Sequence, residues 1–248
     1  MPQHREQQKY NKLLQKAKND DSIIGFILTG SRGKGVVTQY SDYDVALIAT
    51  DEKFSDAREE YAKHKEIEKI DIGVMSISGF RNHAAVGSPM EWDRYNYAHL
   101  KVQIDKTGEI QKIADEKGIL PSDSVKEVCK TSLDRYLNYL YRSLKNFRDG
   151  NIIASHLDAC ESIPPLLIFL FAVEGRVRPY NKYLGWELTN YRLKVLSLSH
   201  QTFLNRIQNI IQTGDTTIQK EIMNIVRNLA TKQGYAYILD GWKGYYFG

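Results

Sequence analysis

Apolar residues recur at helical spacing over residues 3–19, and the pattern then changes to that of strands. Residues 23–29 and 44–48 are apolar runs joined by a long, glycine-rich polar connection, and residues 68–76 alternate apolar and polar side chains. A charged, helix-prone segment at 52–67 separates the last two strands. The order strand, strand, helix, strand predicts a small mixed sheet.

The periodicity disappears over residues 77–92, which contain two glycines and a proline and are expected to form a loop or a short helix. Residues 98–104 are expected to add one more strand. A turn at 105–108 and a further helix follow.

Helical spacing dominates the chain after Pro121, and no strand pattern interrupts it. The expected helices span residues 122–147, 152–174, 187–212 and 215–232. We therefore expect an α+β protein. Residues 1–121 would form a domain with a small mixed β-sheet flanked by helices, and residues 122–248 an all-helical bundle domain.

The composition of the 248 residues is that of an ordinary globular protein, with 42% hydrophobic and 26% charged residues and a mean hydropathy of −0.46. The formal net charge of +4 is mildly basic. It argues against nucleic acid as a partner, because nucleic-acid-binding domains concentrate basic side chains on one face. An anionic small substrate fits this charge.

Cys129 and Cys160 have no CxxC partner and no histidine at metal-ligand spacing, so we expect two reduced thiols in a cytoplasmic protein. The N-terminal residues are polar and lack an apolar signal core. The longest apolar run, 163–173, has only 11 residues and two prolines. Neither secretion nor membrane spanning is therefore expected.

The glycine-rich connection between the first two strands fails two tests for a phosphate-binding loop. Gly30 and Gly35 have the spacing of a Walker-type loop, but Val36 and Val37 stand where lysine and serine or threonine are needed. A dinucleotide fingerprint would need a glycine where Thr38 stands.

Asp42 and Asp44 flank a single residue at the entrance to the second strand, so their side chains project from the same face, about 6.5 Å apart along the backbone. Two carboxylates on one face repel each other unless a cation lies between them, and Mg²⁺ prefers oxygen ligands. Gly30 and Ser31 can offer backbone N–H groups and a hydroxyl to a phosphate oxygen.

A third carboxylate belongs to Asp71, the only charged side chain in the apolar part of its strand, where an unpaired ion would be costly. If that strand lies beside the one that carries Asp44, three carboxylates converge. They could then hold two Mg²⁺ ions roughly 4 Å apart. The alternative is a strand-end aspartate that faces water, which Gly73 on the same face would permit.

This order of residues resembles the polymerase-β-type nucleotidyltransferase superfamily. The resemblance covers residues 28–75 and consists of a glycine–serine pair, ten intervening residues, the sequence Asp-Tyr-Asp and a later strand aspartate. It implies that the glycine and serine contact a nucleoside triphosphate. It also implies that Asp42 and Asp44 bind two Mg²⁺ ions and that Asp71 binds the catalytic one.

A second segment, His156–Leu188, resembles the helical domain of bacterial proteins related to aminoglycoside nucleotidyltransferases. The resemblance implies transfer of a nucleoside monophosphate, usually AMP from ATP, to a hydroxyl. It also implies that Glu161 is the general base. Pro164 and Pro165 predict that the helix kinks or restarts directly after Glu161, because proline lacks an N–H donor and disfavours helical geometry before it.

Five basic residues accompany these motifs. Arg32 and Lys34 are candidates to neutralise phosphate charge, as is Lys182 across a cleft between the two domains, although such residues are commonly just solvent-exposed. Arg176 and Arg178 are expected to tie down the loop that precedes Lys182.

The function expected from the sequence is Mg²⁺-dependent, ATP-binding nucleotidyl transfer to a small hydroxylated acceptor, aminoglycoside-like as in resistance enzymes or of another kind. Two alternatives stay open: transfer to RNA or to a protein hydroxyl, and a non-catalytic nucleotide-binding regulatory module. The base preference and the existence of a homodimer are also open. The aromatic segment 234–248 would line an acceptor pocket or pack on the last helix.

Overall fold

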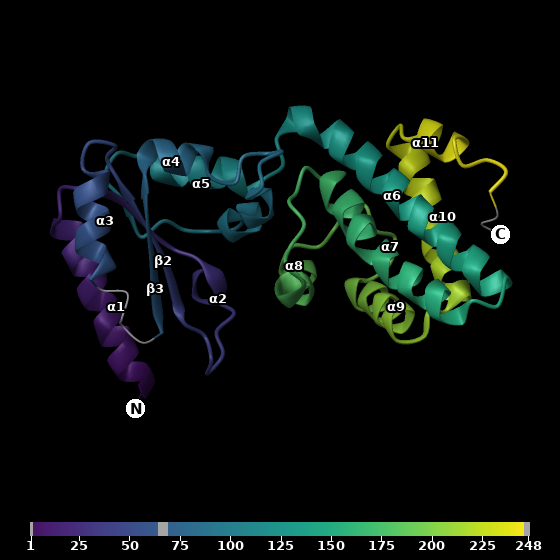
Figure 1. Cartoon of the computed structure of the whole chain (residues 1–248), viewed down its shortest axis with the longest axis horizontal. Helices are drawn as coiled ribbons and strands as arrows, with labels where there is room; N and C mark the ends of the chain where they lie inside the picture. Colours follow the sequence, from purple (N-terminus) through teal and green to yellow (C-terminus); the bar gives the residue numbers. More distant parts are fainter. Residues whose placement is uncertain (1, 64–68, 246–248) are drawn as a thin grey trace. The chain divides into compact units, whose positions relative to one another are not determined.

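The protein is described by a computed structural model that covers residues 2–63 and 69–245. The chain divides into two compact units, Met1–Ile119 and Leu120–Gly248 (Figure 1). The first contains a mixed sheet with helices, and the second is built from helices. The expected α+β class is confirmed.

The sheet of the first unit has four strands in the order β3-β2-β1-β4. Strand β1 pairs in antiparallel fashion with both β2 and β4, whereas β2 and β3 are parallel. Parallel neighbours need a crossover connection, and helix α3 lies in this one. The strands are β1 (Ile23–Leu28), β2 (Tyr43–Ala49), β3 (Ile70–Ser76) and β4 (Ile104–Asp105).

Helices pack on both faces of this sheet (Figure 1). On one face, α1 and α3 cover inward-pointing side chains such as Val45 and Leu47. On the other face, α4, η1 and α5 pack around Ile27, Ile48 and Phe80. The bounds are α1 (Pro2–Asn19), α2 (Gly30–Gly33), α3 (Phe54–Ala62), α4 (Ile77–Asn82), the 3₁₀-helix η1 (Glu91–Tyr97) and α5 (Ile110–Gly118).

Two predictions for the first unit need correction. Residues 98–103 do not form a strand, and only the two residues of β4 pair with β1. The apolar side chains of this irregular segment, including Ala98 and Leu100, are nevertheless buried, which explains its strand-like pattern. Helix α3 is shorter than the expected 52–67, and residues 64–68 lie outside the described residues.

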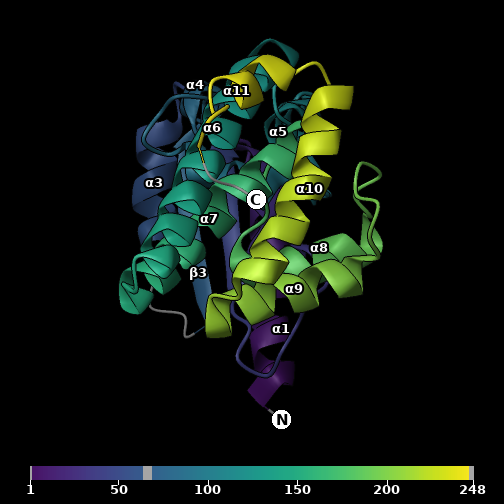
Figure 2. The ribbon, with the colours of Figure 1, turned by 90° about the vertical axis from the view of Figure 1, so that its right-hand side faces the viewer.

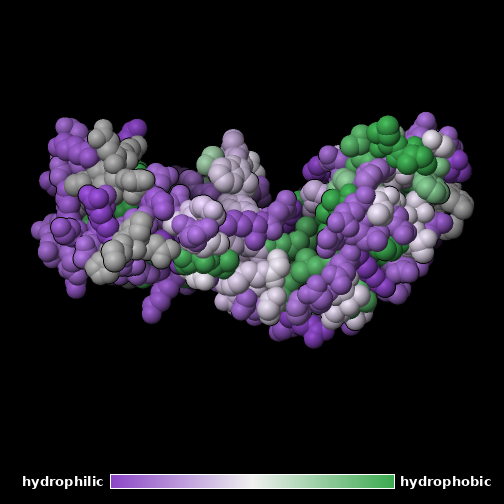
Figure 3. All heavy atoms as spheres, turned by 90° about the horizontal axis from the view of Figure 1, so that it is seen from below, coloured by the Kyte–Doolittle hydropathy of each residue, from purple (hydrophilic) through white to green (hydrophobic). Residues whose placement is uncertain are grey.

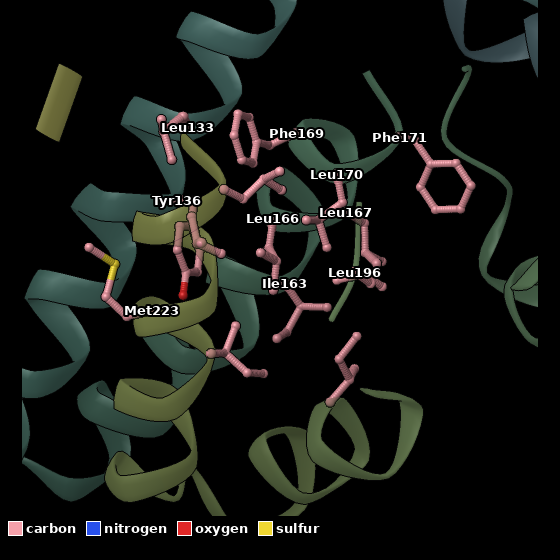
Figure 4. Close-up of a cluster of buried hydrophobic side chains, with 14 of the residues drawn as sticks. Leu133, Tyr136, Ile163, Leu166, Leu167, Phe169, Leu170, Phe171, Leu196 and Met223 are labelled. Atoms are coloured by element: carbon pink, nitrogen blue, oxygen red, sulfur yellow. The ribbon is translucent and has the colours of Figure 1, made fainter. Parts of the chain in front are cut away.

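The second unit packs its helices around one apolar core (Figures 2 and 4). Tyr136 of α6, Leu166 and Phe169 of α7, and Met223 of α10 meet in this core. The bounds are α6 (Ser122–Arg148), α7 (Ile152–Ala172), the 3₁₀-helix η2 (Asn181–Tyr183), α8 (Leu184–Asn190), α9 (His200–Thr213), α10 (Thr216–Lys232) and α11 (Ala236–Asp240).

Helix α7 continues through Pro164 and Pro165, so the expected restart after Glu161 is wrong. A row of buried side chains on both sides of the prolines, such as Ile163 and Leu166, holds the backbone in the helix despite the missing donors. In the described part of the chain, α7 is the one helix long and apolar enough to cross a membrane, and half of its most apolar stretch is buried inside the protein.

The predicted helix over 187–212 is divided into two. Helix α8 ends at Asn190, and α9 begins at His200, where the side chain of the preceding Ser199 accepts a hydrogen bond from the N–H of Thr202 at 3.1 Å.

Exposed apolar atoms gather on the second unit on the side shown in Figure 3. The large exposed apolar side chains near its α6–α7 turn are Phe147, Ile152, Ile153 and Leu157.

Candidate active site

Two of the three candidate carboxylates are direct neighbours across the sheet. In the parallel ladder between β2 and β3, Asp44 pairs with Asp71. Neighbouring strands lie about 4.8 Å apart, and paired residues point to the same face. The two side chains therefore start from adjacent positions, as the sequence argument required.

Asp42 lies just before β2 and two residues before Asp44, so the alternation of an extended chain predicts that it shares this face, and its side chain is exposed. Further along β2, the same face carries Ile48, which is fully buried under α4 and α5. The other end of the face is open to solvent: Asp42 and Asp71 are exposed and Asp44 is partly exposed. One end of this face is thus packed, and the other presents carboxylates.

The exposure of Asp71 corrects one premise of the sequence analysis. The side chain does not lie among the apolar side chains of its strand, because Ile70 and Ile72 point to the opposite, buried face. Gly73 is exposed on the same face as Asp71. What distinguishes Asp71 is its neighbour Asp44, since two negative charges at this spacing repel each other unless a cation offsets them.

Gly30 lies directly against the carboxylate of Asp44. Its φ of +60° is in the left-handed region, and a Cβ built on it would overlap Oδ2 of Asp44. The backbone adds a second link, because the N–H of Thr29 donates to the carbonyl of Asp44 at 2.8 Å. Only glycine fits this position without displacing the carboxylate.

The short helix α2 starts at Gly30, so the amides of Gly30, Ser31 and Arg32 have no acceptor within the helix. The hydroxyl of Ser31 is 2% exposed and donates to Oγ of Ser41 at 2.9 Å. The backbone amides of this turn, rather than the serine hydroxyl, are therefore its donors for an external oxygen.

The two basic residues of the loop are directed at carbonyl groups of the first unit. Lys34 is 6% exposed, and its ammonium group donates to the carbonyls of Tyr95 at 2.9 Å and Ala98 at 2.6 Å. Arg32 donates twice to the carbonyl of Ser41. These placements leave the expected phosphate contacts of Arg32 and Lys34 without geometric support.

Glu161 and Lys182 belong to the second unit, whereas the three aspartates belong to the first. The side chain of Glu161 is exposed on α7. Lys182 is exposed in η2, with its Nζ 5.3 Å from the ring centre of Tyr183.

The loop between α7 and η2 is tied down by ion pairs, as expected for Arg176. Its guanidinium pairs with Glu187, which is 1% exposed, and with Glu174 at 3.4 Å. Arg178 donates to the side chain of Asn181. Glu187 was not identified as a partner from the sequence, because it is 11 residues from Arg176 and no helical or strand period relates the two residues.

The described part of the aromatic segment contacts both α6 and the last long helix, α10. Trp242 donates its indole N–H to Asp134 at 2.9 Å, and the ring of Tyr245 lies 4.9 Å from that of Tyr141. Trp242 and Tyr245 also line two adjoining cavities of about 430 and 530 Å³ on the second unit.

Among the residues that the structure describes, no three His, Cys, Asp or Glu side chains converge closely enough to hold a metal ion. The donor set nevertheless fits a hard divalent cation, because Asp44 and Asp71 are in register and Asp42 shares their face.

Comparison with known proteins gives one match to a protein family. Residues 10–85 match the profile of the nucleotidyltransferase domain family. No curated protein is detectably similar to the chain. A solved nucleotidyltransferase-like protein from Exiguobacterium sibiricum is 12% identical, with a TM-score of 0.40 over 92% of this chain and 80% of that one.

The matched residues contain the whole constellation described above: the Gly30–Ser31 turn, the in-register pair Asp44 and Asp71, and Asp42 on the same face. Residues 10–85 therefore belong to the nucleotidyltransferase domain family, and this domain supports a nucleotidyltransferase enzyme of the polymerase-β-type superfamily.

Proposed function

We propose that the protein transfers a nucleoside monophosphate, AMP in the first instance, from a nucleoside triphosphate to a hydroxyl of a small acceptor. The oxygen of the acceptor forms a bond to the α-phosphorus, the bond between that phosphorus and the bridging oxygen to the β-phosphate breaks, and pyrophosphate leaves. The observation that carries the proposal is the in-register pair Asp44 and Asp71 beside Gly30.

In this proposal Asp42 and Asp44 bind two Mg²⁺ ions, and Asp71 binds the one nearer the acceptor. Bound Mg²⁺ would offset the charge of the triphosphate and lower the pKa of the attacking hydroxyl. The exposure of Asp42 and Asp71 supports this role, because both ends of the carboxylate set are accessible.

The backbone at the start of α2 binds the triphosphate. Amides without an acceptor in the helix are ready donors to phosphate oxygens, and the missing Cβ of Gly30 leaves room for a phosphate near Asp44. Ser31 contributes its amide, since its hydroxyl is bonded to Ser41.

Glu161 is the proposed general base that accepts the proton of the acceptor hydroxyl, and Lys182 is a proposed triphosphate ligand. Both assignments rest on the resemblance of residues 156–188 to aminoglycoside nucleotidyltransferase relatives. The exposure of both side chains is compatible with contact to substrates.

A small acceptor, aminoglycoside-like or of another class, is favoured over RNA because the net charge is only +4 over 248 residues. The test is pyrophosphate release with ATP, GTP, CTP or UTP against a panel of hydroxylated acceptors that includes aminoglycosides and lincosamides. Activity with one small acceptor that depends on Mg²⁺ supports the proposal.

The matched control for this experiment is the pair D42N and D56N, because Asp56 is an exposed aspartate on α3, which covers the opposite face of the sheet. Activity should be lost in D42N and kept in D56N. Nucleotide label that moves only to RNA or protein, or nucleotide binding with no pyrophosphate release for any acceptor, contradicts the proposal.

A further inference from the structure

The guanidinium of Arg32 contacts both neighbours of Asp42. Its Nε and Nη2 donate to the carbonyl oxygen of Ser41 at 3.3 and 3.0 Å. Its central carbon lies 3.9 Å from the ring centre of Tyr43, which is cation–π contact. One side chain thus holds the peptide group before Asp42 and the side chain after it.

Both contacts of Arg32 are to groups that are themselves fixed. The Tyr43 ring is 2% exposed, stacks on Tyr10 with 4.6 Å between centres, and donates its hydroxyl to Gln7 at 2.7 Å. Burial raises the pKa of Tyr43, and the positive charge of Arg32 opposes that rise. The phenol therefore stays a neutral donor at neutral pH.

The other residue that Arg32 contacts, Ser41, is hydrogen-bonded to two further residues of the loop. Its hydroxyl accepts from the N–H of Thr38 and from the hydroxyl of Ser31, both at 2.9 Å, and the residue is 5% exposed. The serine whose amide lies in the proposed triphosphate turn is thereby connected to the residue next to Asp42. Arg32 adds two hydrogen bonds to the carbonyl oxygen of the same Ser41.

We propose that Arg32 is a positioning residue that sets the direction of the Asp42 carboxylate and does not bind the triphosphate. The inference rests on the proposed role of Asp42 as a metal ligand. Asp42 stands just before β2: the peptide group after it is held by the N–H of Tyr43, which donates to the carbonyl of Lys69 at 2.9 Å, and Arg32 restrains the peptide group before it through the carbonyl of Ser41. Outer-shell partners of this kind tune metal affinity through the ligand they orient.

The chemistry of arginine explains why this residue type is needed. A planar guanidinium can donate two hydrogen bonds in its plane while its face stacks on an aromatic ring, whereas a lysine ammonium is a compact point charge that cannot do both. A residue that only supplied charge to phosphate would accept lysine instead. The variants R32K and R32M therefore separate the two roles.

The experiment measures Mn²⁺ binding to the nucleotide-free protein, by electron paramagnetic resonance, for the wild type, R32K and R32M. If Arg32 positions Asp42, both variants should weaken Mn²⁺ binding about tenfold, which is typical of outer-shell changes. If Arg32 acts only as a charge near the site, R32M removes a repelling cation and Mn²⁺ binds more tightly or equally well. That result overturns the inference.

Two controls keep the result interpretable. R58M removes an exposed arginine of α3 and should leave Mn²⁺ affinity unchanged. Y43L should weaken Mn²⁺ binding like R32M, and the double variant should lose little more, because both changes remove one stack. Additive losses contradict the shared mechanism.

Failure of the inference differs from failure of the proposed function. If the wild type binds Mn²⁺ and D42N does not, the metal role of Asp42 holds, and R32M decides the inference alone. If the wild type binds no Mn²⁺ under conditions where it remains folded by circular dichroism, the proposed metal site is wrong and the inference is overturned with it.

Discussion

Asp44 and Asp71 occupy paired positions on the parallel strands β2 and β3, on the open end of one sheet face. Without a cation, the pair is a source of repulsion in the folded protein. If the pair binds a divalent cation, as we propose, the ladder register couples protein stability to metal binding at this face.

The first prediction concerns D71N. Removal of one charge should stabilise the metal-free protein by less than about 1 kcal/mol, because the carboxylates are exposed to water and their repulsion is screened. Nucleotidyl transfer should fall by at least about 100-fold, since a metal ligand would be lost. Thermal unfolding with and without Mg²⁺ and nucleoside triphosphate, together with pyrophosphate release, measures both effects.

The control for D71N is the metal dependence of its stability. Wild-type protein should gain thermal stability from Mg²⁺ with nucleotide, because a ligand that binds only the folded state stabilises it. D71N should gain clearly less. An equal gain in both proteins would show that Asp71 does not contribute to metal or nucleotide binding.

A second prediction compares G30A with G35A. Both glycines have positive φ, +60° and +71°, so alanine costs about 1–2 kcal/mol of backbone strain at either position. Only at Gly30 would the new Cβ overlap Oδ2 of Asp44, while nothing lies within 4 Å of a Cβ at Gly35. Both variants should lose similar stability, and only G30A should lose nucleotidyl transfer.

Chemical denaturation and pyrophosphate release measured on the same samples check this comparison. The denaturation midpoint reports the shared backbone strain, and the rate reports the displaced carboxylate. Comparable activity in the two alanine variants would mean that the contact between Gly30 and Asp44 has no part in the reaction.

The alternation of strand side chains was enough to predict that Asp42 and Asp44 share one face. It could not fix the register between β2 and β3, because a crossover of this length allows several registers. The pairing of Asp44 with Asp71 is therefore known from the structure. The exposure of Asp71 was one of two alternatives that the sequence left open, since it depends on which half of the sheet face α4 and α5 cover.

The roles of Arg32 and Lys34 could not be predicted for a different reason. Their partners are backbone carbonyls, of Ser41 for Arg32 and of Tyr95 and Ala98 for Lys34. Every residue has a carbonyl group, so no side-chain pattern marks these acceptors. Basic residues in a glycine-rich loop therefore give the same sequence pattern whether they bind phosphate or hydrogen-bond to the backbone of the loop.

A third prediction concerns pH and Asp105. Desolvation acts to raise the pKa of Asp105, but the backbone N–H groups of Gln111, Ile110, Gly108 and Thr107 outweigh it and lower the pKa. Because the folded-state pKa is depressed, the stabilisation is present above the ordinary aspartate pKa of about 3.9 and is lost as the pH falls through the folded value.

D105N should therefore destabilise the protein by about 1 kcal/mol at pH 7, as for loss of a helix cap, and the difference from wild type should shrink below pH 4. Urea denaturation at pH 7 and at pH 3 measures it. A difference that stays constant across this range would assign the effect to packing rather than to the carboxylate charge.

The last prediction concerns E161Q, which preserves the shape of the side chain and removes its basicity. If Glu161 accepts the proton of the acceptor hydroxyl, turnover should fall by about 100-fold or more, the usual contribution of general base catalysis. Nucleoside triphosphate binding should change less than about twofold, because proton transfer is not part of nucleotide binding.

The matched control is E127Q, at an exposed glutamate of α6, which should keep full turnover. Rapid-quench turnover and isothermal titration on both variants measure the two quantities. Since Glu161 is exposed on a continuous helix, E161Q should not alter the fold, so loss of turnover with intact nucleotide binding can be assigned to the carboxylate itself. Unchanged turnover in E161Q would remove Glu161 from the mechanism. The proposed reaction would then rely on the metal ion alone to activate the acceptor hydroxyl.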